Sequence, residues 1–160
     1  DLQQEVRQRF GDADDNEPVL NILSFGFARG LPRNADLVFD MRYLRNPHWD
    51  AKLKPGTGLD ADVAAYVQAD PAYEDSVAQI ERLILTLLPR YRAEGKSYVT
   101  IAFGCTGGRH RSVHVAARVA ETLRASGYEP ALTHRNLDSA PQDGLEGKPP
   151  PARSAGGGKP

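Results

Sequence analysis

Short runs of aliphatic and β-branched residues, separated by polar stretches, are the first feature of this chain's hydrophobic pattern. Runs of this kind are typical of strands buried in a parallel sheet. Three of them cover residues 19–25, 37–41 and 98–103. A fourth run, over residues 129–135, contains Pro130, which has no N–H to donate, so this strand is predicted at an edge of the sheet.

Apolar residues at helical spacing fill the segments between these strands. They form amphipathic stripes over residues 77–91 and 113–123, and a shorter one over residues 63–67. Asp60 and Asp70 stand where helix N-caps are expected. The alternation of strands with helices predicts an α/β fold, as a small three-layer domain with a mainly parallel sheet and helices on its faces.

Composition divides the chain into three parts. Its 160 residues, 40% hydrophobic and 26% charged, are typical of one globular domain. Residues 1–17 carry six acidic and two basic side chains and are expected to be a flexible N-terminal segment. In residues 138–160 ten positions are Gly or Pro, which predicts a disordered tail. The folded domain is therefore predicted to span residues 18–137.

The single cysteine excludes an internal disulfide framework and fits a reducing compartment. No apolar run approaches the roughly 20 residues that a membrane span needs, and the N-terminus does not resemble a signal peptide. We therefore expect a cytoplasmic protein without a membrane partner.

The stretch 104–112 lies between a predicted buried strand and a predicted helix. Its two adjacent glycines allow successive backbone N–H groups to face one point, and the positive end of the helix adds to their field. Exposed donors at this place indicate an anion site, above all for phosphate. The stretch lacks the lysine of a Walker A loop, and we predict neither a cofactor nor a metal. Its candidate ligand-binding residues are Cys105, Thr106, Gly107, Gly108, Arg109, His110, Arg111 and Ser112.

Polar and glycine-rich segments also follow the first two strands, and the carboxyl ends of parallel strands meet at one edge of a sheet. These segments are therefore expected to complete the same pocket, with Ser24, Gly26, Arg29, Asp40, Arg42, Asn46 and His48 as further ligand-binding candidates. Two interpretations of His48 and Trp49 stay open: an aromatic plug that closes the core, or a His48 that Trp49 presents to the pocket.

Six short motifs, taken in order and spacing, resemble the C-terminal domain of the RNase adapter RapZ (YvcJ) family. They cover about residues 19–137 and are Ser24-Phe25-Gly26-Phe27, Asp40-Met41-Arg42, Asn46-Pro47-His48-Trp49-Asp50, Thr57-Gly58-Leu59-Asp60, the stretch 104–112, and His134-Arg135.

This resemblance implies a regulatory adapter rather than a catalyst, one that senses glucosamine-6-phosphate, binds small RNA and presents it to an endoribonuclease. It implies a homo-oligomer and a phosphosugar pocket that includes Arg42, His48, Thr106, His110 and Arg111. The RNA-binding candidates are Arg45, His134 and Arg135. The chain departs from the family in two respects: it has no Walker A domain, and its C-terminal end lacks a dense run of lysine and arginine, which makes RNA binding the less secure expectation.

Two alternatives remain. The spacing Cys105-x5-Arg111-Ser112 also resembles the signature loop of protein tyrosine phosphatases, with Cys105 as nucleophile, Arg111 for the phosphoryl group and Asp40 or Asp50 as general acid. Gly104 stands where those enzymes usually have histidine. The other alternative is a plain interaction module whose loops are only turns.

Overall fold

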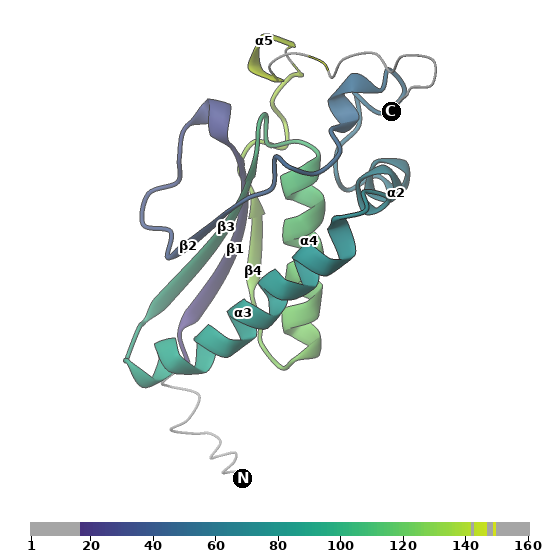
Figure 1. Cartoon of the computed structure of the whole chain (residues 1–160). Helices are drawn as coiled ribbons and strands as arrows, with labels where there is room; N and C mark the ends of the chain where they lie inside the picture. The colour runs from purple at the N-terminus through teal and green to yellow at the C-terminus, as the bar shows by residue number, and fades with distance from the viewer. Residues whose placement is uncertain (1–16, 142, 147–148, 150–160) are drawn as a thin grey trace.

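The computed structural model describes residues 17–141, 143–146 and 149. Four strands form one sheet in the order β2-β3-β1-β4, and every neighbouring pair is parallel (Figure 1). The register places Gly26 beside Cys105, Asp40 beside Gly104 and Ser24 beside His134, so the carboxyl ends of all four strands lie along one edge. The strands are β1 (Val19–Gly26), β2 (Leu37–Asp40), β3 (Tyr98–Cys105) and β4 (Ala131–His134).

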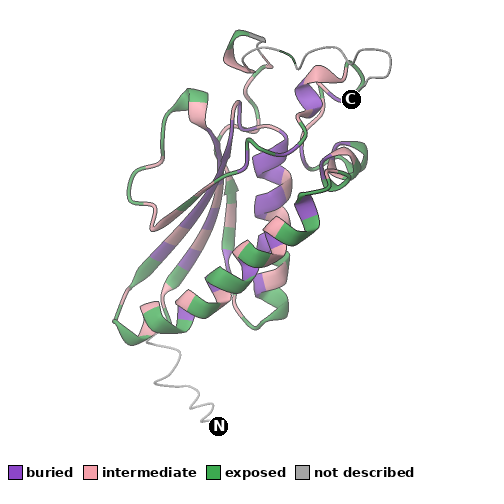
Figure 2. Ribbon diagram, viewed as in Figure 1, coloured by how far each residue is buried: buried purple, intermediate pink, exposed green. Residues whose placement is uncertain are grey.

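The long helices cover one face of this sheet. Strand residues of one parity, such as Ile22 and Ile101, form a single buried cluster with residues of α3 and α4, such as Ile84 and Val119 (Figure 2). Their burial provides the main stabilisation of the domain, because apolar area removed from water contributes about 25 cal/mol per Å². The helices are α2 (Ala61–Gln68), α3 (Tyr73–Ala93), α4 (Arg111–Ala125) and α5 (Asp143–Glu146), with short 3-10 turns η1 (Phe27–Arg29) and η2 (Pro47–Trp49).

The α/β class and the parallel sheet with helices packed against it are confirmed. The layering differs in detail, since both long helices lie on the same face and the described residues place no helix on the other. That other face carries Val19, Val38 and Tyr98, which are 52%, 45% and 66% exposed. Near the carboxyl ends it is covered by Phe27, whose ring meets that of Phe25 edge-on at 4.8 Å. A short crossover without a long helix joins β1 to β2, which leaves this face open.

The segment predicted to be a disordered tail contains α5, one helical turn that the structure describes. Most of the remaining tail and residues 1–16 lie outside the described residues. Asp60 precedes α2 as expected, but its carboxylate accepts from the N–H of Thr57 rather than from the helix. None of the described helices has the length and apolar character that crossing a membrane requires.

Candidate functional site

The turn between β3 and α4 is held against the end of β1 by close backbone contact. Gly108 has φ +82°, a conformation that residues with a side chain rarely adopt. At Gly26 an added Cβ would lie 2.5 Å from the carbonyl carbon of Gly107. Glycine at both positions therefore lets the loop 106–110 rest directly on β1, above the carboxyl edge of the sheet.

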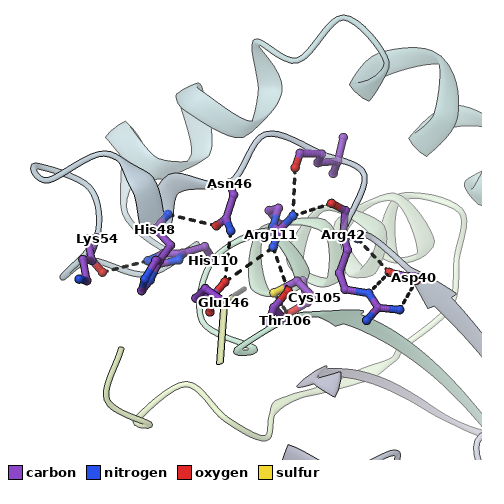
Figure 3. A network of polar contacts seen from close by, with 12 residues as sticks. Asp40, Arg42, Asn46, His48, Lys54, Cys105, Thr106, His110, Arg111 and Glu146 are labelled. Atoms are coloured by element: carbon purple, nitrogen blue, oxygen red, sulfur yellow. Dashed lines mark hydrogen bonds and ion pairs between the residues drawn. The ribbon is translucent and has the colours of Figure 1, made fainter. Parts of the chain in front are cut away.

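Arg111, the first residue of α4, joins this loop to the segment that follows β2. Its Nη1 donates to the carbonyl oxygens of Arg42 at 2.6 Å and Leu44 at 3.1 Å, and its Nη2 to Thr106 Oγ1 at 3.5 Å (Figure 3). The side chain is only 5% exposed. Its Nε has no hydrogen-bond partner among the described residues. Arg111 thus positions two loops and keeps donor capacity in the space between them.

Asp40 and Arg42 form an exposed bidentate pair at the end of β2. The guanidinium donates through Nε at 2.9 Å and Nη2 at 2.6 Å, and it also stacks 4.1 Å from the ring centroid of Phe27. The hydrogen bond from Arg42 holds the pKa of the Asp40 carboxyl below its usual value. Asp40 is therefore a charged partner of Arg42 and is engaged before any ligand binds.

A cavity of about 460 Å³ opens between these loops. This volume lies in the range of small-molecule sites, which typically combine apolar walls with a few polar groups. Arg45 lies on one wall, its guanidinium 3.9 Å from the ring centroid of Tyr66. The lining residues are Arg42, Leu44, Arg45, Asn46, Trp49, Tyr66, Thr106, Arg111 and Glu146.

Of the predicted ligand-binding residues, this cavity brings together Arg42, Asn46, Thr106 and Arg111, with the RNA-binding candidate Arg45 beside them. Sequence reasoning missed Leu44, Tyr66 and Glu146. Tyr66 lies on the apolar side of α2, where it was taken for a core residue. Glu146 comes from a segment with no helical periodicity to draw attention to it.

Glu146 reaches the cavity from α5, one hundred residues away from its partner Asn46. Its Oε1 accepts from Asn46 Nδ2 at 3.2 Å and lies 3.9 Å from Arg111 Nη2 (Figure 3). A Cβ added to Gly107 would lie 2.5 Å from its Oε2. Its side chain is 8% exposed. A buried carboxylate therefore sits against the glycine-rich loop, at the place where the sequence predicts an anion.

Arg109 points away from the cavity and fastens two other segments. Its Nη1 donates to the carbonyl oxygens of Leu137 at 3.1 Å and Ser139 at 2.7 Å, and its Nη2 to those of Pro55 at 2.8 Å and Gly56 at 2.9 Å. Four charge-assisted bonds to backbone carbonyls are what a positioning residue makes. The structure thus gives Arg109 a role in holding the loops rather than a place in the pocket wall.

His110 and His48 lie beneath the loops. His110 Nε2 is 3.1 Å from the carbonyl oxygen of Lys54, and burial, together with the charge of Arg109, lowers the pKa of His110. His48 is 1% exposed, and its ring meets that of Trp49 edge-on at 4.6 Å. Between the two interpretations of this pair, the geometry favours the plug for His48, while Trp49 lines the cavity.

Cys105 and Ser112 are buried side by side at the junction of β3 and α4. The thiol, 2% exposed, lies 3.1 Å from Ser112 Oγ, and neither residue lines the cavity. On the next strands Ser24 Oγ lies 2.7 Å from Nδ1 of His134, whose pKa burial lowers. These two pairs close the top of the core.

The remaining candidates hold the segment that follows β4. Arg29 donates to the carbonyl of Ala140 at 3.2 Å, and Arg135 donates to that of Gly30. The N–H of Gly26 donates to Asn136 Oδ1 at 2.8 Å. In the part of the chain that the structure describes, no group of three His, Cys, Asp or Glu side chains is placed to hold a metal ion.

The family of the chain follows from comparison with known domains. The RapZ C-terminal domain matches residues 18–138, which is most of the chain and includes every loop that forms the cavity. The chain belongs to the RapZ C-terminal domain family. The resemblance read from the six sequence motifs is thereby confirmed, with nearly the same boundaries.

The relatives of this RapZ-type domain are longer proteins. A "nucleotide-binding protein" of Sphingopyxis alaskensis is 90% identical over 158 residues, which cover 99% of this chain and 50% of that protein. Proteins of the same name from Rhizorhabdus wittichii and Novosphingobium aromaticivorans are 58% and 54% identical, over 86% and 92% of this chain and 44% and 48% of theirs. The chain spans about half the length of the curated relatives it matches.

Proposed function

We propose that this RapZ-type domain binds a phosphorylated sugar of the glucosamine-6-phosphate class and acts as an RNA-binding adapter that regulates RNA decay. The observation that carries the first part is the cavity at the carboxyl ends of β2 and β3, where arginines, a glycine-rich loop and two aromatic rings surround a space of about 460 Å³.

The phosphate would lie against the loop 106–110. Arg111 lines the cavity with its guanidinium held in place by carbonyls, so little side-chain entropy is lost when it meets an anion. Thr106 supplies a hydroxyl next to it. The carboxylate of Glu146 already lies against Gly107, which supports an anion subsite at this point.

The sugar would lie toward Trp49 and Tyr66. Aromatic faces suit the apolar C–H surface of a pyranose, and Asn46 offers an amide for a hydroxyl group. A phosphate-only site would not need these rings. Their presence favours a phosphorylated sugar over inorganic phosphate.

RNA binding and the adapter role rest on family membership. Arg45 is an exposed cation at the rim of the cavity, whereas Arg135 and His134 each have a partner within the fold. RNA affinity should fall steeply with salt if phosphate contacts carry it. Filter binding of a small RNA at 50 and 200 mM salt tests this part, and an affinity indifferent to salt would count against it.

Nucleotide binding, from which the relatives take their name, is not assigned to this chain, whose sequence contains no Walker A loop. The phosphatase alternative would need an accessible nucleophile, but Cys105 is buried and does not line the cavity. Turnover of p-nitrophenyl phosphate that disappears in Cys105→Ser would revive that alternative.

Calorimetric titration with glucosamine-6-phosphate, glucosamine and inorganic phosphate tests the phosphosugar proposal. Arg45→Ala is the best variant, because the side chain of Arg45 lines the cavity while only its backbone N–H holds Asp70. We expect at least a tenfold loss of affinity, about 1.4 kcal/mol, for a lost charge-assisted contact. Arg82→Ala removes an exposed arginine of α3 and serves as the matched control. Equal binding of glucosamine and its phosphate, or no binding, would refute the proposal.

A further inference from the structure

The carboxylate of Glu146 makes the kind of contacts that an anionic ligand would make. Asn46 Nδ2 donates to its Oε1 at 3.2 Å, Arg111 Nη2 lies at 3.9 Å, and its Oε2 is seated directly over Gly107. The residue is one of those that line the cavity. It is a side chain of the protein itself, brought from the far end of the described chain.

The segment leading to α5 is tethered, so the carboxylate is delivered to this place rather than resting there by chance. Arg109 binds the carbonyls of Leu137 and Ser139, and Arg29 binds that of Ala140. Beyond Ala140, the polar contacts printed between α5 and the body are those of Glu146. A firmly held stem thus ends in a short turn whose attachment depends on one carboxylate.

We propose that Glu146 is an internal competitor for the anion subsite, so that a phosphorylated ligand and the docked α5 exclude each other. This inference rests on the proposed phosphosugar function and adds its regulation. A phosphoryl group over Gly107 would overlap the carboxylate, and two anions at that distance repel each other in a largely buried setting. Ligand binding therefore releases α5 and changes the surface beside the cavity.

Competition of this kind lowers the apparent affinity in proportion to the fraction of molecules whose subsite is open. If α5 is docked in nine molecules of ten, removing the carboxylate tightens binding about tenfold. Glu146→Gln keeps the size of the side chain and its ability to accept from Asn46, but it removes the charge that Arg111 attracts. Glu94→Gln makes the same charge change at the exposed C-terminal end of α3 and serves as the matched control.

Release of α5 has a readout that does not depend on affinity. Trp49 is the single tryptophan of the chain and lines the cavity together with Glu146. A Cβ added to Gly144 meets no atom within 4 Å, so a small fluorophore attached to Gly144→Cys fits on the outside of α5. Tryptophan quenches such a fluorophore at short range, so undocking should brighten it; Trp49→Phe gives the unquenched level. The native Cys105 is 2% exposed and sheltered from the label.

The experiment combines calorimetry, with glucosamine-6-phosphate and inorganic phosphate as probes, with this fluorescence signal. We expect Glu146→Gln to bind both probes about tenfold more tightly, to be bright without ligand, and the wild-type chain to brighten as ligand is added. Equal affinities for wild type and Glu146→Gln, with a label that stays quenched at saturation, would overturn the inference and leave the phosphosugar proposal standing. Tighter binding of inorganic phosphate by Glu146→Gln, without any preference for the phosphosugar, would do the reverse. Absence of binding to either protein would overturn both.

Discussion

Two adjacent glycines in the loop 106–110 should respond to alanine in opposite ways. Gly108 has φ +82°, and a Cβ there would lie 2.6 Å from the amide nitrogen of Gly26 and 2.9 Å from the carbonyl carbon of Phe25, both backbone atoms of β1. Gly107 has no such conformation, and its added Cβ would meet only the carboxylate end of Glu146. The first obstacle cannot move without the sheet, and the second is the tip of a flexible side chain.

The magnitudes follow from these contacts. Alanine at a left-handed position costs about 1–2 kcal/mol. Overpacking against rigid neighbours adds about 1–3 kcal/mol. Gly108→Ala should therefore lower the free energy of unfolding by about 2–5 kcal/mol. Gly107→Ala displaces Glu146, and the reduced freedom of the unfolded chain returns about 0.4–1 kcal/mol, so its stability should stay within about 1 kcal/mol of the wild type.

Urea unfolding followed by circular dichroism decides the matter. With a slope of about 1–3 kcal/mol per molar urea, Gly108→Ala should shift the midpoint by about 1 M or more, while Gly107→Ala leaves it nearly unchanged. Equal midpoints for the two variants would refute the reasoning. A larger loss for Gly107→Ala would show that the docked carboxylate, rather than the contact with β1, holds the loop.

Three further predictions concern stability. Arg109→Gln should cost about 2–4 kcal/mol, since bonds from a charged donor to four carbonyls are lost; thermal unfolding beside the surface variant Arg82→Gln measures this, and equal melting temperatures would contradict it. Phe103→Ala, at a fully buried position, should cost about 3–5 kcal/mol in urea unfolding; a loss under 1 kcal/mol would contradict the packing. Burial lowers the pKa of His110 below 6.5, so the unfolded chain binds a proton that the folded one does not, and stability should fall as pH drops below about 6.5, by up to about 1.4 kcal/mol per pH unit. A urea midpoint that stays flat between pH 7.5 and 5.5 would contradict this last prediction.

The backbone of the domain could be predicted from the sequence because its signals are local. Runs of β-branched residues define the strands, and 3.6-residue spacing defines α3 and α4. The rim of the cavity was also within reach, since Arg42, Asn46 and Arg111 follow strands whose carboxyl ends must meet. The single-sided layering was not, because helix patterns do not say which face of the sheet they cover.

The roles of Arg109 and Glu146 could not be predicted, for a physical reason. A guanidinium in a glycine-rich loop can satisfy a ligand or four backbone carbonyls equally well, and the partners of Arg109 lie up to 54 residues away in sequence. Glu146 is anchored by polar contacts across one hundred residues and not by an apolar stripe. Composition registers missing apolar residues as disorder, and it is blind to an anchor made of one carboxylate.

The charges around the cavity favour a doubly charged ligand, and this can be tested. Three guanidinium groups, of Arg42, Arg45 and Arg111, line the cavity, and Asp40 neutralises the first. With Glu146 released, two positive charges remain, which matches a phosphate monoester in its dianionic form. The second ionisation of a phosphate monoester has a pKa near 6. Affinity for glucosamine-6-phosphate should therefore weaken as pH falls from about 7.5 to 5, whereas glucosamine-6-sulfate, a single anion throughout, should bind more weakly and with little dependence on pH. Parallel pH profiles for the two esters would show that shape and not charge selects the ligand, because only the phosphate changes its ionisation in this range.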